Sequence, residues 1–249
     1  MPAVRTTPAV RILMIACAVA YLLQMTADTF FNAHVMEWLG LVPYRVFRYG
    51  AVWQLFTYQF LHADLFHILF NMLVLWMIGS ELEGQWGTRF FTRYYLFCGT
   101  AGGLLYILVQ FFFRDSPTSL IPVVGSSGAV YGLLVAYGII HSERMMLFMM
   151  VFPMKAKYFV LLLAGVEFVT TVFGSRSGVA NLAHLGGMLA GFGALTAIAY
   201  KRSRARRPAV KRRRKKHLKL VINNDLLKDF DHSDNDEDDD DGSGRPISH

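Results

Sequence analysis

Long apolar stretches separated by short polar segments dominate the first 200 residues. A helix needs roughly 20 apolar residues to cross the hydrocarbon core of a bilayer, with a range of about 17–25. Six stretches meet this requirement, some of them only because the polar residues inside them can face other helices. They cover about residues 12–31, 65–81, 90–113, 123–140, 146–173 and 179–200. The pattern predicts an all-α membrane protein, a bundle of six transmembrane helices.

The segment between the first two stretches, about residues 32–63, is unusually aromatic. It contains Trp38, Tyr44, Phe47, Tyr49, Trp53, Phe56 and Tyr58. Because Trp and Tyr favour the headgroup level of a bilayer, we expect an interfacial element in the outer leaflet. The fifth stretch is interrupted by Pro153, Lys155 and Lys157, so we expect it to begin with an interfacial part as well.

Composition agrees with a membrane protein. The chain is 54% hydrophobic and 17% charged, whereas soluble domains average about 25% charged residues. The two cysteines, Cys17 and Cys98, both lie in apolar stretches. They form neither a disulfide framework nor a metal-ligand cluster, so we expect no metal and no cofactor.

Positive charge is concentrated directly after the sixth stretch, in residues 201–216. Such a cluster stays cytoplasmic under the positive-inside rule, and an even number of spans then places both termini in the cytoplasm. The first stretch is too long for the apolar part of a cleavable signal peptide, and Gln24 and Asp28 stand where a cleavage site would be. The sequence predicts a multi-pass protein of the cell membrane, and the six-span layout favours a prokaryotic one.

The chain changes character after the membrane domain, residues 1–200. Residues 234–241 are almost all acidic; because such a block repels itself, residues 201–249 are predicted to form a disordered cytoplasmic tail. The basic run suits contact with anionic lipid headgroups, worth about 1 kcal/mol per Lys or Arg near the surface. A nucleic-acid partner is not expected, since the run lacks interleaved aromatic residues and adjoins the acidic block.

Hydrogen-bonding side chains stand at a similar depth in three of the predicted spans. His67 and Asn71 share one face near the start of the second span, Ser127 stands at the start of the fourth, and His184 near the start of the sixth. All three spans enter the membrane from the outer side. Polar groups are expensive in a bilayer unless they face a cavity or each other, so this coincidence indicates a functional site.

The residue types fit nucleophilic catalysis. A serine hydroxyl needs a neighbouring base, so Ser127 would attack while His184 accepts its proton and returns it to the leaving amine. Backbone N–H groups at the start of the fourth span, with His67 and Asn71, could stabilise the oxyanion. Tyr131, one turn after Ser127, could support the imidazole ring.

Glycines in the same motifs have a physical reason. Gly125 and Gly128 allow backbone to approach Ser127 closely, and Gly187, on the face of His184, allows tight helix contact in lipid.

These motifs resemble those of the rhomboid intramembrane serine proteases. The chain has His-x-x-x-Asn in the second span, Gly-x-Ser-Gly at the start of the fourth and Ala-His-x-x-Gly in the sixth. Glu83 followed by Trp86 and Gly87 is similar to a loop element of the family, and the resemblance covers about residues 10–200. One departure is Trp53-Gln54, where some bacterial members have Trp-Arg, which concerns how the first loop is anchored.

The resemblance implies a six-helix core that cleaves transmembrane protein substrates. It implies a dyad of Ser127 and His184, an oxyanion site that includes His67 and Asn71, and Tyr131 stacked on the histidine. It also implies a water-filled cavity open to the outer face and lateral substrate entry beside the fifth span.

Each motif alone has an ordinary explanation, such as helix packing for Gly-x-Ser-Gly, an interhelical hydrogen bond for His67 with Asn71, or a core histidine for His184. Their combination favours catalysis. His62 is interpreted as a structural or interfacial histidine. Glu167, near the same depth, could orient His184 as the third member of a triad or could face the cavity or its lateral entrance. Since the resemblance implies a dyad without an acid, we favour the second role.

Two other functions are alternatives to proteolysis. A non-catalytic rhomboid-like protein would bind membrane proteins without cleaving them, but such relatives typically lack the serine or the histidine, and both are present here. A transporter would need a continuous polar pathway, whereas the inner halves of the second, fourth and sixth spans are almost wholly apolar.

Overall fold

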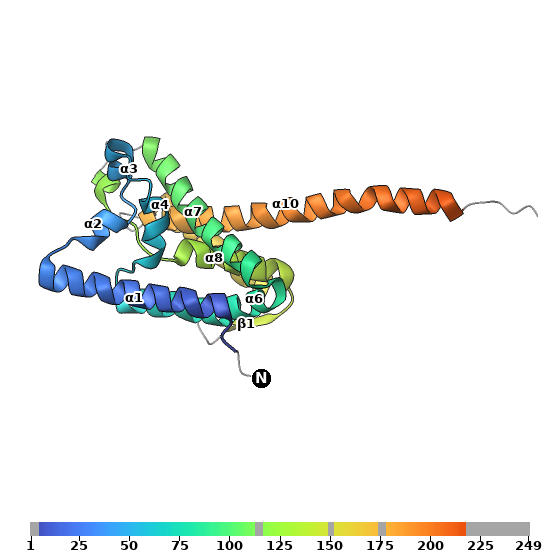
Figure 1. The fold of residues 1–249 in the computed structure, drawn as a ribbon, viewed down its shortest axis with the longest axis horizontal. Helices are drawn as coiled ribbons and strands as arrows, with labels where there is room; N and C mark the ends of the chain where they lie inside the picture. Colours follow the sequence, from blue (N-terminus) through green and yellow to red (C-terminus); the bar gives the residue numbers. More distant parts are fainter. Residues whose placement is uncertain (1–4, 113–116, 149–151, 174–177, 218–249) are drawn as a thin grey trace, which may run out of the picture. The chain divides into compact units, whose positions relative to one another are not determined.

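Helices form nearly all of the regular structure in the part of the chain that the computed structural model describes, residues 5–112, 117–148, 152–173 and 178–217. The chain divides into two units, Met1–Tyr200 and Lys201–His249. Five helices in the described part are long and apolar enough to cross a membrane: Pro8–Phe31, Leu65–Trp86, Thr88–Phe112, Ala156–Phe173 and Ala180–Ala205. A sixth, shorter apolar helix, α8 (Ser127–Ile140), packs among them (Figure 1). The predicted all-α membrane fold is confirmed.

The spanning helices follow the predicted stretches closely. They are α1 (Pro8–Phe31), α5 (Leu65–Val74) continued through a π-helical turn (Leu75–Gly79) into α6 (Ser80–Trp86), α7 (Thr88–Phe112), α9 (Ala156–Phe173) and α10 (Gly178–His217). A proline with helical φ begins α1, and Asn32 in the left-handed conformation ends it.

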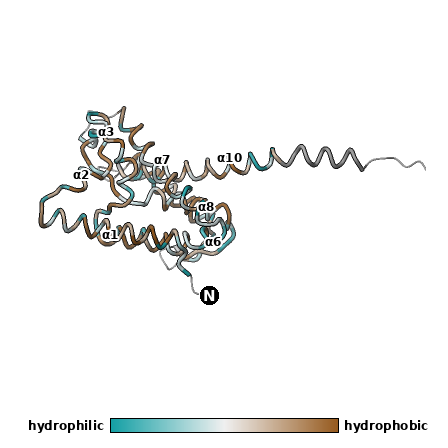
Figure 2. Tube along the Cα trace, viewed as in Figure 1, coloured by the Kyte–Doolittle hydropathy of each residue, from teal (hydrophilic) through white to brown (hydrophobic). Residues whose placement is uncertain are grey.

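Large apolar side chains are exposed along the outer helices. On α1 they include Leu22 and Leu23, and on α9 they include Leu161 and Phe168. Figure 2 shows the hydrophobic colour along α1 and α7. A soluble monomer rarely exposes so much contiguous apolar surface, whereas lipid-facing helices require it.

Helix α8 is the most enclosed of the spans, and it is shorter than predicted. Leu133 and Ala136 in its middle have no exposed surface. The predicted span began at residue 123, but the helix begins at Ser127. The preceding residues are extended because Val123 pairs with Leu41 in an isolated β-bridge and Gly125 has φ +121°. The chain therefore enters the bundle as an extended segment and becomes helical only at Ser127.

A short antiparallel hairpin precedes α9 and differs from the predicted start of the fifth span. Strand β1 (Met145–Phe148) pairs with β2 (Phe152–Lys155), with Met145 opposite Lys155. Pro153 lacks an N–H and disfavours helix interiors, but it is tolerated in a two-stranded edge. The two lysines that interrupt the apolar stretch have polar partners: Lys155 and Lys157 both pair with Glu143. They hold the pKa of the Glu143 carboxyl at about 2.

Helix α10 is described as far as residue 217, past the end of the predicted sixth span at residue 200. Lys, Arg and Ala, which make up most of residues 201–217, are good helix formers. The disorder of the tail stays a prediction. The acidic run 234–241 lies outside the described residues.

Four short helices fold the first loop. They are α2 (Val35–Leu39), α3 (Pro43–Tyr49), α4 (Gln54–Thr57) and a 3-10 turn (Tyr58–Phe60). A further 3-10 turn (Pro117–Leu120) follows α7.

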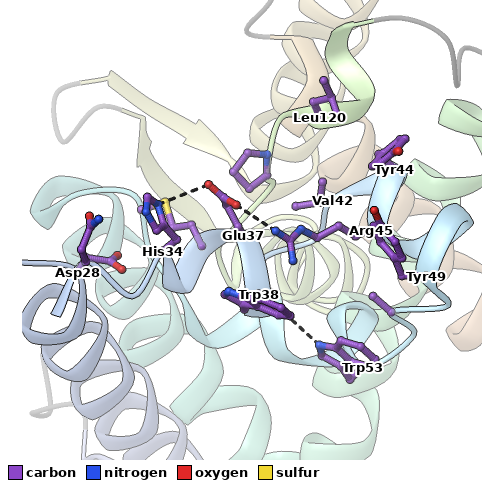
Figure 3. Close-up of a pocket in the computed structure, with 14 residues that line it drawn as sticks. Asp28, His34, Glu37, Trp38, Val42, Tyr44, Arg45, Tyr49, Trp53 and Leu120 are labelled. Atoms are coloured by element: carbon purple, nitrogen blue, oxygen red, sulfur yellow. Dashed lines mark hydrogen bonds and ion pairs between the residues drawn. The ribbon is translucent and has the colours of Figure 1, made fainter.

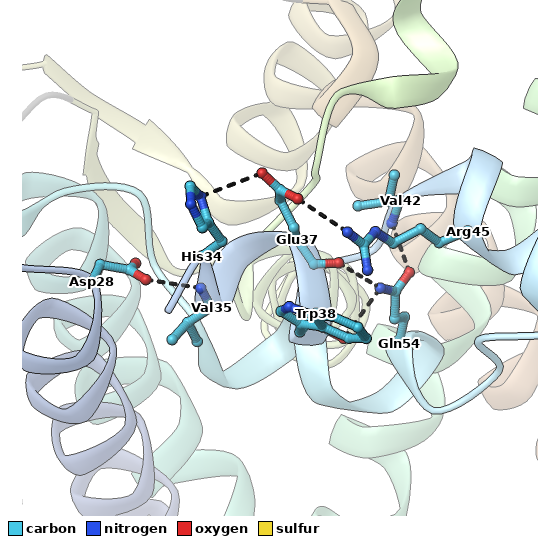
Figure 4. Close-up of polar contacts among 8 residues, drawn as sticks. All are labelled: Asp28, His34, Val35, Glu37, Trp38, Val42, Arg45 and Gln54. Carbon is cyan, nitrogen blue, oxygen red and sulfur yellow. Dashed lines mark hydrogen bonds and ion pairs between the residues drawn. The ribbon is translucent and has the colours of Figure 1, made fainter. Parts of the chain in front are cut away.

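The amide of Gln54 holds the helices of the first loop together. Its Oε1 accepts from the N–H of Val42 at 3.0 Å, and its Nε2 donates to the carbonyls of Glu37 and Trp38 at 3.0 and 3.2 Å (Figure 4). A fully buried glutamine thus anchors the loop at the position where some family members have arginine.

Glu83 joins the beginning of α1 to the end of α6. Its carboxylate accepts from the backbone N–H groups of Ala9 and Val10 at 2.9 and 3.0 Å, and from the hydroxyls of Thr7 and Thr88. The first N–H groups of a helix have no partners within it, and the helix dipole favours an anion there. Glu83 is therefore the N-terminal cap of α1, supplied by a distant part of the chain.

We expect Glu83→Gln to lower the melting temperature of the protein in detergent, because one amide cannot accept from four donors as the carboxylate does. The loss should be about 1–3 kcal/mol of unfolding free energy. Glu143→Gln, which removes exposed ion pairs, is the control and should leave the melting temperature unchanged. Equal melting curves for both variants would contradict the capping role.

We expect Gln54→Leu to loosen the first loop, since the leucine fills similar space but removes the partner of the Val42 N–H and of the Glu37 carbonyl, while the Trp38 carbonyl keeps its bond from the Trp53 indole N–H. Amide hydrogen exchange should become faster in α2 and α3 and stay unchanged in α7, which serves as the internal control. Unchanged exchange in α2 and α3 would show that the loop is held by its other contacts.

Candidate active site

Ser127 and His184 meet at the contact between α8 and α10. The Ser127 Oγ lies 2.7 Å from His184 Nε2, the distance of a strong hydrogen bond. Ser127 is the first residue of α8, and His184 lies in the second turn of α10. Two residues that stand 57 positions apart in the sequence thus come within hydrogen-bonding distance.

The turn before Ser127 depends on Gly125. Its φ of +121° is a conformation that residues with a side chain rarely adopt. Its N–H donates to the Tyr58 carbonyl at 2.9 Å. A Cβ at this position would lie 2.7 Å from the His67 ring and 3.5 Å from Ser127 Oγ. The glycine therefore leaves open the space between the imidazole of His67 and the serine hydroxyl.

Close backbone contact brings α10 against α8. A Cβ on Gly187 would lie 2.0 Å from the Gly128 carbonyl oxygen, and a Cβ on Gly128 would lie 3.2 Å from the Ala183 carbonyl oxygen. At Gly187 only a residue without a side chain permits this approach, and at Gly128 a Cβ would be tight. Since Ala183 precedes His184, the same contact sets the height of the imidazole beside Ser127.

Two further side chains surround the imidazole of His184. The ring of Tyr131 stacks on it with centroids 4.6 Å apart and planes inclined by 10°. Glu167, on α9, has its Oε1 3.1 Å from His184 Nδ1, and the Tyr131 hydroxyl donates a hydrogen bond to the same oxygen. Ser127 and Glu167 thus approach the two different nitrogens of one ring.

His67 and Asn71 stand on α5. The carboxylate of Asp64 accepts from the backbone N–H of His67 at 2.8 Å and caps α5. His67 Nδ1 accepts from the Ala63 N–H at 3.4 Å. A neutral imidazole that accepts at Nδ1 carries its proton on Nε2, the nitrogen beside Gly125. The Asn71 amide donates to the His67 carbonyl at 2.9 Å, which uses one of its two N–H groups.

His62 lies behind the turn that carries the serine. It is fully buried, and its Nε2 is 3.5 Å from Ser126 Oγ. Gln24 hydrogen-bonds to its backbone. Burial, with a smaller effect of His67, lowers its pKa to about 4, so the ring is neutral at pH 7. These contacts agree with the structural interpretation of His62.

The contact of Glu167 with His184 was the less favoured of two interpretations of the sequence. In the sequence, the only sign of this contact is a single carboxylate in the middle of an apolar span. Sequence spacing cannot tell which face of α9 meets the bundle, and the structure turns Glu167 inward.

A cavity of about 970 Å³ lies in the first loop, away from the dyad (Figure 3). Its walls include Asp28, Glu37, Arg45, Trp38 and Trp53, and neither Ser127 nor His184 lines it. The guanidinium of Arg45 pairs with Glu37 and stacks on Trp38, and the Asp28 carboxylate accepts from the Val35 N–H. Within the described ranges, no group of three or more His, Cys, Asp or Glu side chains could hold a metal ion.

The chain is similar to known proteins of one family. The family model of the Rhomboid domain matches residues 49–201. The rhomboid protease GluP of Bacillus subtilis (strain 168) is 26% identical over 167 residues, which cover 67% of this chain and 30% of the relative. RHOMBOID-like protein 1 of Arabidopsis thaliana is 37% identical over 143 residues, 57% of this chain and 33% of the relative.

The rhomboid protease GlpG of Yersinia pestis (strain Pestoides F) is 35% identical over 75 residues, 30% of this chain and 26% of the relative. The chain thus spans about a third or less of the length of each of these three relatives. The family match covers more than half of the 249 residues and includes every candidate site residue named above. The apolar helices and this match identify a multi-pass membrane protein, and the chain belongs to the rhomboid family.

Proposed function

We propose that the protein is an intramembrane serine endopeptidase, which hydrolyses a peptide bond in or near the transmembrane segment of membrane-protein substrates. The observation that carries this proposal is the 2.7 Å contact between Ser127 Oγ and His184 Nε2 at the beginning of α8. Two relatives are named rhomboid proteases, which supports the same activity.

The reaction follows from the positions of these groups. Ser127 attacks the carbonyl carbon of the scissile bond while His184 Nε2 takes the hydroxyl proton. The imidazolium then donates this proton to the leaving amine, and the peptide bond breaks to give an acyl-enzyme. Water, activated in turn by His184, hydrolyses the ester and restores the free serine.

The negative oxygen of the tetrahedral intermediate needs fixed donors. Backbone N–H groups in the first turn of α8 lack partners within the helix and carry the positive end of its dipole. His67 contributes Nε2–H beside Gly125, and Asn71 contributes the N–H that its bond to the His67 carbonyl leaves free. Together they form the proposed oxyanion site.

The membrane orientation is part of the proposal. The basic residues at the end of α10 remain in the cytoplasm under the positive-inside rule, with the N-terminus on the same side. The active site then opens toward the outer face of a cell membrane, and the basic tail contacts anionic headgroups. Transmembrane substrates enter laterally beside α9.

The alternative is a non-catalytic rhomboid-like protein that binds membrane proteins. Such a protein has no need for an activated serine. The presence of both Ser127 and His184, within hydrogen-bonding distance, favours the enzyme.

We expect a serine-directed fluorophosphonate probe to label the wild-type protein in detergent but not Ser127→Ala or His184→Ala. Each variant should also lose cleavage of a transmembrane peptide, and the double variant should be no worse than either, because the two residues act as a unit. Circular dichroism provides the folding control. Folded wild-type protein that neither labels nor cleaves would favour the binding protein instead.

We expect Asn71→Ala to lower turnover by about 10²–10³-fold, the usual cost of one oxyanion donor. The Ser127–His184 pair and the fold should persist. Labelling by the probe should still slow, because the oxyanion site has lost one donor. A turnover equal to that of wild type would remove Asn71 from the oxyanion site.

A further inference from the structure

We infer that Glu167 is a positioning residue for His184, so that the site works as a serine–histidine–glutamate relay rather than as a dyad alone. This inference rests on the proposed protease function. It departs from the dyad that the family resemblance implies, and it is carried by contacts made from three different helices.

The first observation is the burial of Glu167. Among the residues of α9, only Ala156 at its start and Glu167 in its middle are buried. Several large apolar side chains of the helix are exposed instead, such as Leu161 and Phe168. A carboxylate is costly to bury in a membrane protein and is retained where it has a charged or hydrogen-bonding partner. The orientation of α9 therefore brings the one acidic residue of the helix to the active site.

The second observation is what Glu167 meets there. Its Oε1 lies 3.1 Å from His184 Nδ1, on the side of the ring opposite the nitrogen that contacts Ser127. The Tyr131 hydroxyl donates to the same oxygen while its ring stacks on the imidazole. Tyr131 thus holds both the carboxylate and the ring, which fixes their separation.

The third observation concerns two buried atoms. Within the described part of the chain, His184 Nδ1 and Glu167 Oε2 have no hydrogen-bond partner of good geometry. Both atoms belong to the two side chains that meet here, although the oxygen nearest to Nδ1 is Oε1. A buried polar atom without a partner is costly, and a small rotation of the Glu167 carboxylate would align an oxygen with the Nδ1–H. Catalytic hydrogen bonds are commonly loose without substrate and tighten when it binds.

These contacts define the role of the carboxylate. An Nδ1–H held by Glu167 leaves Nε2 unprotonated and directed at Ser127, which is the tautomer that a general base requires. When Nε2 takes the serine proton, the imidazolium lies beside a negative charge. The proton on Nδ1 stays on the histidine throughout, so Glu167 acts through His184 and never touches the substrate.

The test compares Glu167→Gln, Glu167→Asp and Tyr131→Phe with wild type, and Thr171→Val is the matched control. Thr171 lies one turn further along α9, where its hydroxyl donates to the carbonyl of Glu167 within the same helix. Three quantities are measured in detergent: the labelling rate with a small fluorophosphonate, kcat and KM for a transmembrane peptide, and the melting temperature.

We expect Glu167→Gln to lower both the labelling rate and kcat by about 10²-fold, within the range of general acid–base effects, with KM unchanged. Glu167→Asp keeps the charge and should recover part of the loss. Tyr131→Phe keeps the stacked ring but frees the carboxylate, so its loss should be smaller than that of Glu167→Gln. Thr171→Val should match wild type in every quantity.

Other outcomes would overturn the inference. Normal labelling with altered peptide KM would assign Glu167 to substrate entry, since the small probe does not need the lateral path. Wild-type values throughout would leave a dyad. If Glu167→Gln does not fold, Glu167→Asp decides: positioning requires slower labelling at unchanged KM, and a wild-type rate contradicts it. Wild-type protein that neither labels nor cleaves would instead refute the proposed function itself.

Discussion

The close backbone approach of α8 and α10 is the contact on which the rest of the site depends. Gly187 leaves no room for a side chain against Gly128, and a Cβ at Gly128 would itself lie only 3.2 Å from the Ala183 carbonyl oxygen. This contact fixes the height of His184 beside Ser127, and the imidazole in turn provides the surface on which Tyr131 stacks. In lipid, where apolar surfaces gain little by meeting each other, such small-residue packing is a main source of helix association.

Polar side chains inside the bundle show how the fold tolerates groups that a bilayer disfavours. Gln54 joins the pieces of the first loop, Glu83 caps α1 from a distant position, and Glu167 contacts His184. Each is buried, and each bonds to a segment far from it or to another helix. These residues therefore determine the arrangement of helices more specifically than the apolar contacts around them.

The position at which α8 begins decides which backbone groups lie beside Ser127. Because the chain before it is extended and held by the Leu41–Val123 bridge, the N-terminus of the helix begins within the bundle rather than at its edge. Free N–H groups and the serine therefore stand together at an internal helix end. A helix that began at residue 123 would have carried the serine beyond its first four residues, where the backbone N–H donors are already used.

The sequence by itself determined the membrane class, the number of apolar helices and the pairing of Ser127 with His184 as candidates, because apolar length and motif order are local properties of the chain. It did not reveal the hairpin before α9, the late start of α8, or that Gln54 replaces the expected anchor. It also left the role of Glu167 open. Those features depend on which face of each helix turns inward, and only contacts between distant segments decide that, through the cost of burying a polar group without a partner.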